Sequence, residues 1–394
     1  MRGDGFRVLR EQVRHGARMI LTEEQLLIQE TARKFAQQQL APNSAQWERQ
    51  AAFPRGIFKE LGELGFMGVT VPVEWGGAGA DNVAYSLVLQ EIAAGDGALA
   101  TVVSGHNSVG VMPILNWGTQ AQKERYVREM ATGAKLTAFA LTEPQGGSDA
   151  AAIRTRAVRK GDRWVLNGTK QFITSGSTAD IALVFAVTEP AAGKRGISAF
   201  IVDTKTPGYI VARVEKKMGQ NASDTCEILL EDCAIAADCL LGEEGRGYRI
   251  ALANLESGRI GIASQSVGMA RAALEIAVRY AHEREAFGKR IFEHQAVAFR
   301  LADMAVGLEA ARQLTLHAAA LKDAGRPCLT EASMAKLFAS ETAEKICSDA
   351  IQTLGGVGYI EDFGVERIYR GVRGAKIYEG TNDIQRLVIS RSLN

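Results

Sequence analysis

The chain lacks the features that would place it in several common protein classes. No C-x-x-C pair occurs among its five cysteines, and an odd number of cysteines in 394 residues argues against a disulfide framework. Basic and acidic side chains balance at 46 and 45, so the net charge of +1 provides no bulk attraction to nucleic acid or to an anionic membrane. The longest apolar runs, such as 181–187, are far shorter than the ~20 residues that span a bilayer. We therefore expect a protein of a reducing compartment that binds neither nucleic acid nor membrane.

Several catalytic signatures are also missing. The sequence contains no G-x-G-x-x-G after a predicted strand, no G-x-x-x-x-G-K-[ST], no G-x-S-x-G and no H-E-x-x-H. His282 and Glu283 begin a zinc motif, but Ala286 stands where the second histidine would be, and a solvated helix face explains the pair better. These absences exclude the usual dinucleotide, nucleotide, serine-hydrolase and zinc sites. The composition, with 46% apolar residues and only 8 prolines, is typical of a globular enzyme-sized chain.

The pattern of the chain predicts helices, then a β domain, then helices again. Helical spacing begins at Thr22, a candidate N-cap, and continues to about residue 132. Short β-branched and aromatic runs follow to about residue 241, and Asn167-Gly168 predicts a tight hairpin turn between two of them. Long amphipathic patterns return after Gly247. We expect an N-terminal extension at 1–18, a helical domain at 19–134, a β domain at 135–241 and a helical bundle at 242–394.

The first eighteen residues differ from the rest. They contain five arginines against two acidic residues, and they contain no serine, which a transit peptide would be rich in. We interpret them as an upstream or artificial start, with Met19 as an alternative first residue.

A loop at 139–149, Phe-Ala-Leu-Thr-Glu-Pro-Gln-Gly-Gly-Ser-Asp, enters the β domain. A threonine hydroxyl, a proline that reverses the chain and two consecutive glycines form a loop whose backbone N–H groups can face an anion or a flat ring. A tight loop capped by Asp149 explains the same residues equally well. The loop alone does not identify a ligand.

Three other segments combine charged residues with glycine. In 377–386, Glu379 stands beside Gly380 before a last helix that Asn382 and Asp383 could cap; Glu379 could equally be an exposed loop acid. In 256–261, Arg259 opens a long helix, where it could form an ordinary surface ion pair. In 284–289, followed by His294 and Gln295, a solvated turn is the simpler interpretation. Each segment is weak evidence by itself.

Together, and in this order, these motifs resemble the acyl-CoA dehydrogenase family. The signature A-[LV]-T-E-P-x-x-G-S-D is intact at 140–149, Y-E-G-T at 378–381 and L-G-G at 354–356, and the similarity runs from about Met19 to Asn394. The resemblance implies an α+β, mainly helical fold with an N-terminal helical domain, a central β-barrel-like domain and a C-terminal four-helix bundle. It also implies FAD as cofactor, an acyl-CoA thioester as substrate, the 2,3-enoyl-CoA as product and electron-transfer flavoprotein as electron acceptor.

The resemblance assigns roles to individual residues. Glu379 is implied as the base that removes the α-proton; Gly258 occupies the position where some relatives carry the base instead, and glycine cannot serve. Substrate contacts are implied for Ser148, Glu256, Arg259, Tyr378 and Gly380. Flavin contacts are implied for Phe139, Leu141, Thr142, Gly147, Ser148, Phe172, Thr174, Arg284, Phe287, Gln295, Gln352, Gly355, Gly356, Thr381 and Asp383. Several of the flavin contacts in the family reach across a subunit interface, so the resemblance implies a homo-oligomer, usually a tetramer built as a dimer of dimers.

The chain departs from the family pattern at three positions. Phe172 stands where many members have tryptophan, Asn221 where several have arginine, and Gly371 where aspartate is usual. The last two put in doubt contacts near the CoA tail and ion pairing beneath the last helix. Two other functions compete with dehydrogenation: a flavin oxidase or monooxygenase of the same fold, and a DNA-binding flavoprotein, which the net charge disfavours.

The acyl chain length is not set by these motifs. The pocket floor is expected from residues 100–106, and the stretch 259–263 favours short-chain or short branched substrates. A bacterial cytoplasmic location is expected rather than a mitochondrial one.

Overall fold

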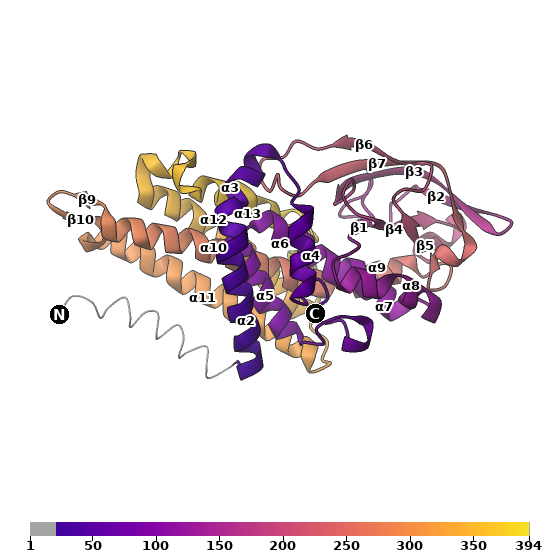
Figure 1. Ribbon diagram of the computed structural model, residues 1–394, viewed down its shortest axis with the longest axis horizontal. Helices are drawn as coiled ribbons and strands as arrows, with labels where there is room; N and C mark the ends of the chain where they lie inside the picture. Colours follow the sequence, from indigo (N-terminus) through magenta and orange to yellow (C-terminus); the bar gives the residue numbers. More distant parts are fainter. Residues whose placement is uncertain (1–20, 394) are drawn as a thin grey trace.

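The computed structural model describes residues 21–393, so the arginine-rich N-terminal segment and the choice between Met1 and Met19 lie outside the described residues. The sheet lies at one end of the molecule, and most of the helices that precede and follow it in the chain pack together beside it (Figure 1). This arrangement confirms the predicted fold class.

The N-terminal region packs its helices around the apolar α5. It contains α2 Glu23–Phe35, a π-helical turn Ala36–Leu40, α3 Ala41–Gln50, α4 Arg55–Glu63, α5 Asn82–Gly95, α6 Gly97–Gly105, a second π-helical turn His106–Val111, α7 Met112–Trp117 and α8 Gln120–Ala131. The predicted N-cap at Thr22 is confirmed, because its side chain accepts from the backbone N–H of Gln25 while the Gln25 side chain accepts from that of Thr22.

One stretch of this region has the length and composition of a membrane span. Residues Gly97–Trp117 are long and apolar enough to cross a bilayer, but 78% of the most apolar 18-residue part of this stretch is buried inside the protein. A helix that its own domain covers in this way has the environment of a core helix.

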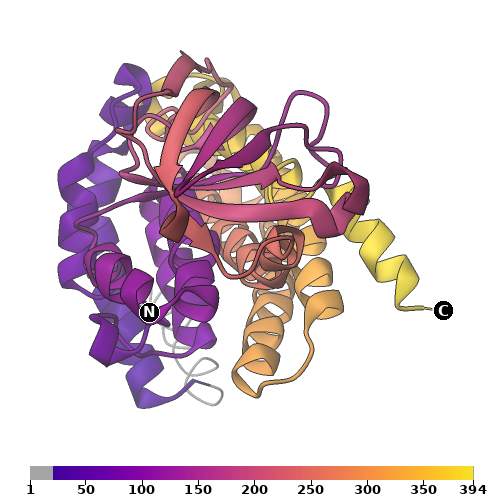
Figure 2. The ribbon, with the colours of Figure 1, turned by 90° about the vertical axis from the view of Figure 1, so that its right-hand side faces the viewer.

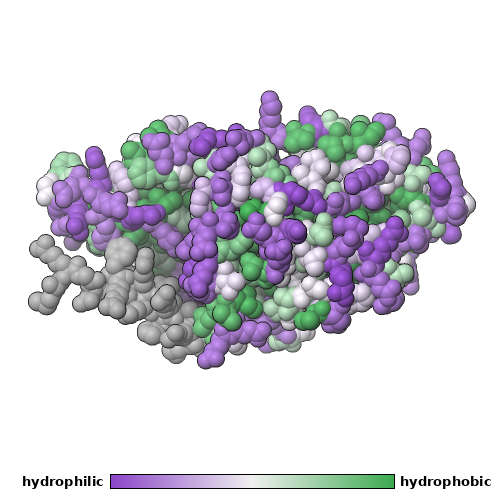
Figure 3. Space-filling view, in the orientation of Figure 1, coloured by the Kyte–Doolittle hydropathy of each residue, from purple (hydrophilic) through white to green (hydrophobic). Residues whose placement is uncertain are grey.

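The central region is a single mixed sheet. Its strands are β1 Thr137–Ala140, β2 Arg156–Lys160, β3 Arg163–Thr174, β4 Ile181–Val187, β5 Ile197–Asp203, β6 Tyr209–Val214, β7 Thr225–Ala236 and β8 Leu240–Leu241. They lie in the order β6-β7-β3-β2-β4-β5-β8, and β1 pairs with β4 in parallel. Figure 3 shows an apolar area along the edge strand β6, where Val211 and Val214 are exposed among charged neighbours.

The hairpin predicted at Asn167-Gly168 is wrong. Strand β3 runs straight through both residues, and a register shift against β7 at Leu166/Gly168 accommodates the glycine. The Asn167 side chain pairs with Asp232 on β7, since its amide donates to Asp232 Oδ1 at 3.1 Å and its carbonyl accepts from the Asp232 N–H at 2.8 Å. The Asn-Gly pair that predicts a turn therefore lies at a bulge within a longer strand.

The C-terminal region is built on three long helices. They are α10 Leu255–Glu283, α11 Gln295–Asp323 and α12 Leu329–Leu354, preceded by α9 Gly247–Ala253 and followed by α13 Val365–Val372 and α14 Asn382–Arg391. A small hairpin of β9 Glu285–Ala286 and β10 Lys289–Arg290 joins α10 to α11 at the end of the molecule opposite the sheet (Figure 1). Figure 2 shows α14 standing away from the body. The cap of α14 is Thr381, whose hydroxyl accepts from the Ile384 N–H, and the predicted cap by Asn382 or Asp383 is wrong because both lie inside the helix.

Candidate functional site

Glu379 lies in a strained turn between the 3-10 turn Arg373–Lys376 and α14. Its backbone has φ of 54° and that of Gly380 has φ of 82°, a left-handed conformation that a glutamate rarely adopts. Two buried side chains hold the turn in place. Lys336 Nζ on α12 donates to the Gly380 carbonyl at 2.9 Å, and Gln385 Nε2 donates to the same oxygen at 2.8 Å. The direction of the Glu379 side chain is therefore fixed by the fold.

Glu379 is half-buried, and its carboxylate oxygen Oε2 is buried with no hydrogen-bond partner within the described residues. It rests on α10 at Gly258, where a Cβ atom would lie 2.7 Å from Oε2 and 2.9 Å from Cδ. Burial raises the pKa of Glu379, and the nearby charges of Arg259 and Lys336 oppose that rise. An acid with free lone pairs in such a place can accept a proton from a bound molecule.

Arg259 lies close to this carboxylate without bonding to it. The guanidinium is buried on α10, and its Nη1 donates to Ser333 Oγ at 3.2 Å. Burial lowers the pKa of Arg259, whereas the charges of Glu379 and Glu256 raise it. Glu256 lies a turn earlier, 3.9 Å from Lys322 Nζ. Arg259 thus supplies positive charge to the site while the Glu379 oxygens stay free.

Tyr378, directly before Glu379, joins three parts of the chain. Its hydroxyl donates to Gln265 Oε1 on α10 at 2.8 Å and accepts from Gln220 Nε2 at 2.9 Å. Gln220 in turn accepts from Thr101 Oγ1 on α6 at 2.6 Å. Since Gln220 follows the sheet strand β6, this network positions the Glu379 turn against both the sheet region and α6.

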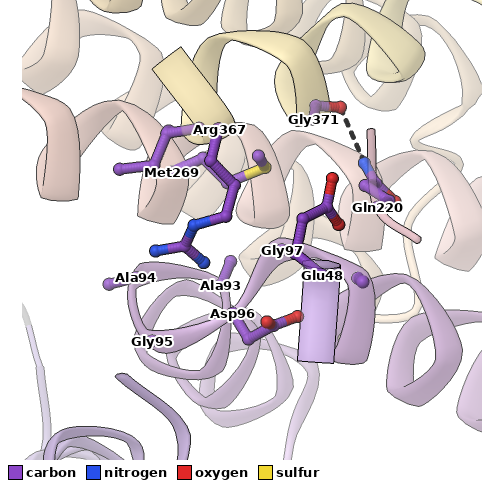
Figure 4. Close-up of a pocket in the computed structure, with 12 residues that line it drawn as sticks. Glu48, Ala93, Ala94, Gly95, Asp96, Gly97, Gln220, Met269, Arg367 and Gly371 are labelled. Carbon is purple, nitrogen blue, oxygen red and sulfur yellow. Dashed lines mark hydrogen bonds between the residues drawn. The ribbon is translucent and has the colours of Figure 1, made fainter. Parts of the chain in front are cut away.

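A small pocket lies beside that network, between the 218–221 loop, α13 and the N-terminal helices (Figure 4). Its volume of about 40 Å³ has room for one or two waters. Gly371, where the family pattern has aspartate, lines it, and Arg370 instead pairs with Glu48 at 2.8 Å. Asn221 also donates to Glu48, from its backbone at 2.6 Å and from its side chain at 3.0 Å. Glu48 therefore links Arg370 and Asn221 through one carboxylate at this pocket.

The signature loop that follows β1 is fixed by a buried ion pair. Lys170 Nζ on β3 lies 2.8 Å from Glu143 Oε1 and donates to the carbonyls of Leu141 and Phe185 at 3.2 and 2.6 Å. The Glu143 carboxylate also accepts the backbone N–H groups of Arg154 and Thr155. Burial lowers the pKa of Lys170 to about 8, although the Glu143 charge opposes the shift. No motif in the sequence indicates this role for Lys170.

The predicted ring-binding residues gather around this loop. Phe139 lies in β1, the Thr142 carbonyl accepts the Gln171 N–H at 2.9 Å, and Gly147 and Ser148 are exposed. Phe172 is 60% exposed, because φ of 57° at a register shift in β3 turns its ring outward. An exposed aromatic face beside an open, glycine-rich backbone suits a flat ring such as an isoalloxazine.

Six of the predicted cofactor residues lie at the other end of the molecule. Arg284, Gly355 and Gly356 line an open hollow of about 410 Å³ between the end of α10 and the 3-10 turn Gly355–Gly358. Phe287, in the adjacent hairpin, is 97% exposed, and Gln295 and Gln352 are exposed as well. Figure 1 places this hairpin and the sheet at opposite ends. The predicted cofactor residues of one chain therefore form two separate groups, which we term half-sites, and the structure does not bring them together.

Two predicted cofactor residues have other roles in the chain. Thr381 caps α14, and the Asp383 side chain is exposed, 3.7 Å from Arg386 Nη1. Two residues that contact the Glu379 turn were not predicted as site residues: Gln385 and Lys336. The only sequence signal of Lys336 is that it falls on the apolar side of the α12 pattern, where a lysine is unusual.

Comparison with known proteins matches the acyl-CoA dehydrogenase models in all three parts: the N-terminal domain at residues 22–134, the middle domain at 138–233 and the C-terminal domain at 245–394. An acyl-CoA dehydrogenase of Bacillus subtilis is 48% identical, covering 95% of this chain and 99% of its own. The mitochondrial short-chain specific acyl-CoA dehydrogenase of Rattus norvegicus is 46% identical, covering 95% of this chain and 90% of its own.

Solved structures agree with the sequence matches. Butyryl-CoA dehydrogenase from Megasphaera elsdenii has a TM-score of 0.93 at 40% identity, covering 95% of this chain and 98% of its own. A chain from a study of the electron transferring flavoprotein of Acidaminococcus fermentans has the same TM-score at 44% identity, with the same coverage. A glutaryl-CoA dehydrogenase of Mycobacterium smegmatis in complex with FADH2 has a TM-score of 0.90 at 34% identity, covering 95% of each chain. The chain therefore belongs to the acyl-CoA dehydrogenase family of FAD-dependent oxidoreductases.

Proposed function

We propose that the protein oxidises a short-chain or short branched acyl-CoA thioester to the trans-2-enoyl-CoA, with Glu379 as the base and electron-transfer flavoprotein as the electron acceptor. The observation that carries the proposal is the Glu379 carboxylate itself. Its Oε2 atom is buried and lacks a hydrogen-bond partner in the described residues. A strained turn directs the side chain, which lies against Gly258 on α10.

The reaction breaks two C–H bonds, and Glu379 takes part in one of them. Its carboxylate accepts the α-proton, while bound FAD supplies the acceptor for the hydride that leaves the β-carbon. The Glu379 backbone N–H donates to no acceptor within residues 21–393, so it is free to hold the thioester oxygen as negative charge develops there. Arg259 and Lys336 then stabilise the ionised base before the reaction, without occupying its oxygens.

The pattern of exposed residues on α6 supports a short acyl chain in the substrate. Between Ala100 and His106 only Thr101 and Gly105, one helical turn apart, keep partial exposure. A Cβ on Gly105 would meet nothing within 4 Å, whereas Gly261 on α10 is closed off by the hydroxyls of Ser104 and Tyr85. We propose that the free space at Gly105 receives the end of the acyl chain and that the Ser104–Tyr85 contact closes the pocket beside it.

The two half-sites support an assembly of more than one copy. The ring-binding residues at the sheet and the hollow at Gly355 lie at opposite ends of one chain, so an extended FAD at either end needs residues from a second copy to complete its site. Exposed apolar side chains on the C-terminal region supply contact area, including Phe299 and Val306 on α11 and Tyr359 beside the hollow. We propose a homo-oligomer, a tetramer by family resemblance, in the bacterial cytoplasm.

A panel of acyl-CoA thioesters mixed with the purified flavoenzyme without oxygen tests the proposal. Butyryl-CoA and isobutyryl-CoA should bleach the flavin with higher kcat/KM than octanoyl-CoA, and the bleached enzyme should pass its electrons to electron-transfer flavoprotein. No bleaching by any thioester would refute the function. Rapid reoxidation by oxygen, faster than by electron-transfer flavoprotein, would favour the oxidase of the same fold.

A further inference from the structure

Lys336 is an unusual residue for the position it occupies. It lies in the middle of α12 with none of its side chain exposed, and no acidic side chain forms a salt bridge with it in the described chain. A buried, unpaired ammonium group is costly, because burial removes its hydration. Lysines in such places need a compensating role.

The contacts of Lys336 lie on the turn that carries Glu379. Its Nζ donates to the Gly380 carbonyl at 2.9 Å and to Asn382 Oδ1 at 3.0 Å. Asn382 is held in turn by Ser340, whose hydroxyl lies one helical turn from Lys336. The lysine thus connects α12 to both sides of the strained turn, at the residue after the base and at the start of α14.

The charges around Lys336 are few and identifiable. Glu379 comes from the turn and Glu341 from α12, and both favour the charged lysine; Arg259 from α10 opposes it. Burial outweighs the acids and lowers the pKa of Lys336 to about 7. In return, Lys336 and Arg259 both lower the pKa of Glu379 against its burial.

We propose that Lys336 is a positioning residue for the base: it holds the Glu379–Gly380 turn in its left-handed conformation and, while protonated, keeps the Glu379 carboxylate ionised. The inference rests on the proposed role of Glu379. Neither function requires Lys336 to touch the substrate. While it is protonated, Lys336 lowers the pKa of Glu379, as Arg259 does.

The test is the pH profile of kcat/KM for butyryl-CoA, measured with Lys336→Met, Lys336→Arg and the control Lys345→Met. Lys345 is on the same helix but exposed, where it pairs with Asp349. Removing the buried charge should raise the pKa seen in the acid limb by about one to two pH units, as expected for a charge roughly 6 to 12 Å away at an effective dielectric constant of about 20. Lys336→Arg keeps the charge, so its acid-limb pKa should stay close to that of the wild type even if its turnover is lower. Lys345→Met should change neither the acid-limb pKa nor the turnover.

Two outcomes would overturn the proposal. One is a Lys336→Met enzyme whose kcat falls while the acid limb stays at the wild-type pH, since a purely structural role gives that result. The other is wild-type turnover and an unchanged limb in the same variant. If Lys336→Met does not retain flavin, Lys336→Gln is compared with Lys336→Arg instead. The same acid-limb pKa in these two variants would refute the role of the charge. Failure of the proposed function is distinguishable, because the wild-type enzyme would then not be reduced by butyryl-CoA at all.

Discussion

Replacing Gly258 by alanine should damage catalysis while leaving the protein folded. An added Cβ would lie 2.7 Å from Glu379 Oε2 and 3.2 Å from Oε1, closer than ordinary contact at about 3.4 Å or more. The atoms it meets are the end of a flexible side chain, so the carboxylate moves by several tenths of an ångström and the helix does not. Alanine also favours the helix over glycine by up to about 1 kcal/mol, which offsets the cost of the displacement.

The expected loss follows from the geometry of proton transfer. A misplacement of about 1 Å costs on the order of 100-fold in rate, so Gly258→Ala should lower kcat with butyryl-CoA by about 10- to 100-fold. Its melting temperature should stay within a few degrees of the wild type. Gly56→Ala is the matched control, because Gly56 also lies in a helix and a Cβ there would meet nothing within 4 Å. Wild-type turnover in Gly258→Ala, with the protein fully flavin-loaded, would refute the inferred position of the carboxylate.

Three further outcomes are expected. Gly105→Val fills the free space on α6, so kcat/KM should fall more for hexanoyl-CoA than for butyryl-CoA, and an equal fall for both would place the acyl chain elsewhere. Burial lowers the pKa of His106 to about 4, whereas its pKa in the unfolded chain is about 6.5. Between these two pH values the unfolded chain binds more protons than the folded protein does. About 3 kcal/mol of the free energy of unfolding should therefore be lost as pH falls from about 6.5 to 4. His106→Gln should flatten that dependence in denaturant titrations, and an unchanged slope would contradict the buried neutral state. Thr142→Ala should shift the visible spectrum of the bound flavin, and a spectrum identical to the wild type would exclude a contact.

Local patterns in the sequence predicted the order of the three regions and the start of α2, because helical spacing and capping depend on residues close together in the chain. The hairpin turn predicted at Asn167-Gly168, in contrast, is wrong. A turn needs its two flanking strands to pair with each other, whereas here both halves pair with β7, which lies about 60 residues later. A local sequence pattern cannot identify β7 as the partner strand.

Some residues of the candidate site could likewise be predicted from local motifs, and others could not. Glu379, Gly258 and the signature loop could be recognised from motifs. Lys336 and Lys170 could not, because lysines are ordinarily exposed and the carbonyl oxygens that hold these two come from distant segments. The separation of the two cofactor half-sites also depends on the lengths and directions of α10 and α12, which motif spacing does not specify.

The most direct test of the account is the anaerobic reduction of Glu379→Gln by butyryl-CoA, followed through the visible absorbance of the bound flavin. Glutamine keeps the size of the side chain but cannot accept the α-proton, so the variant should purify with its full complement of FAD and show no bleaching, while the wild type bleaches within the mixing experiment. Substantial bleaching or turnover in Glu379→Gln would contradict the assignment of Glu379 as the base.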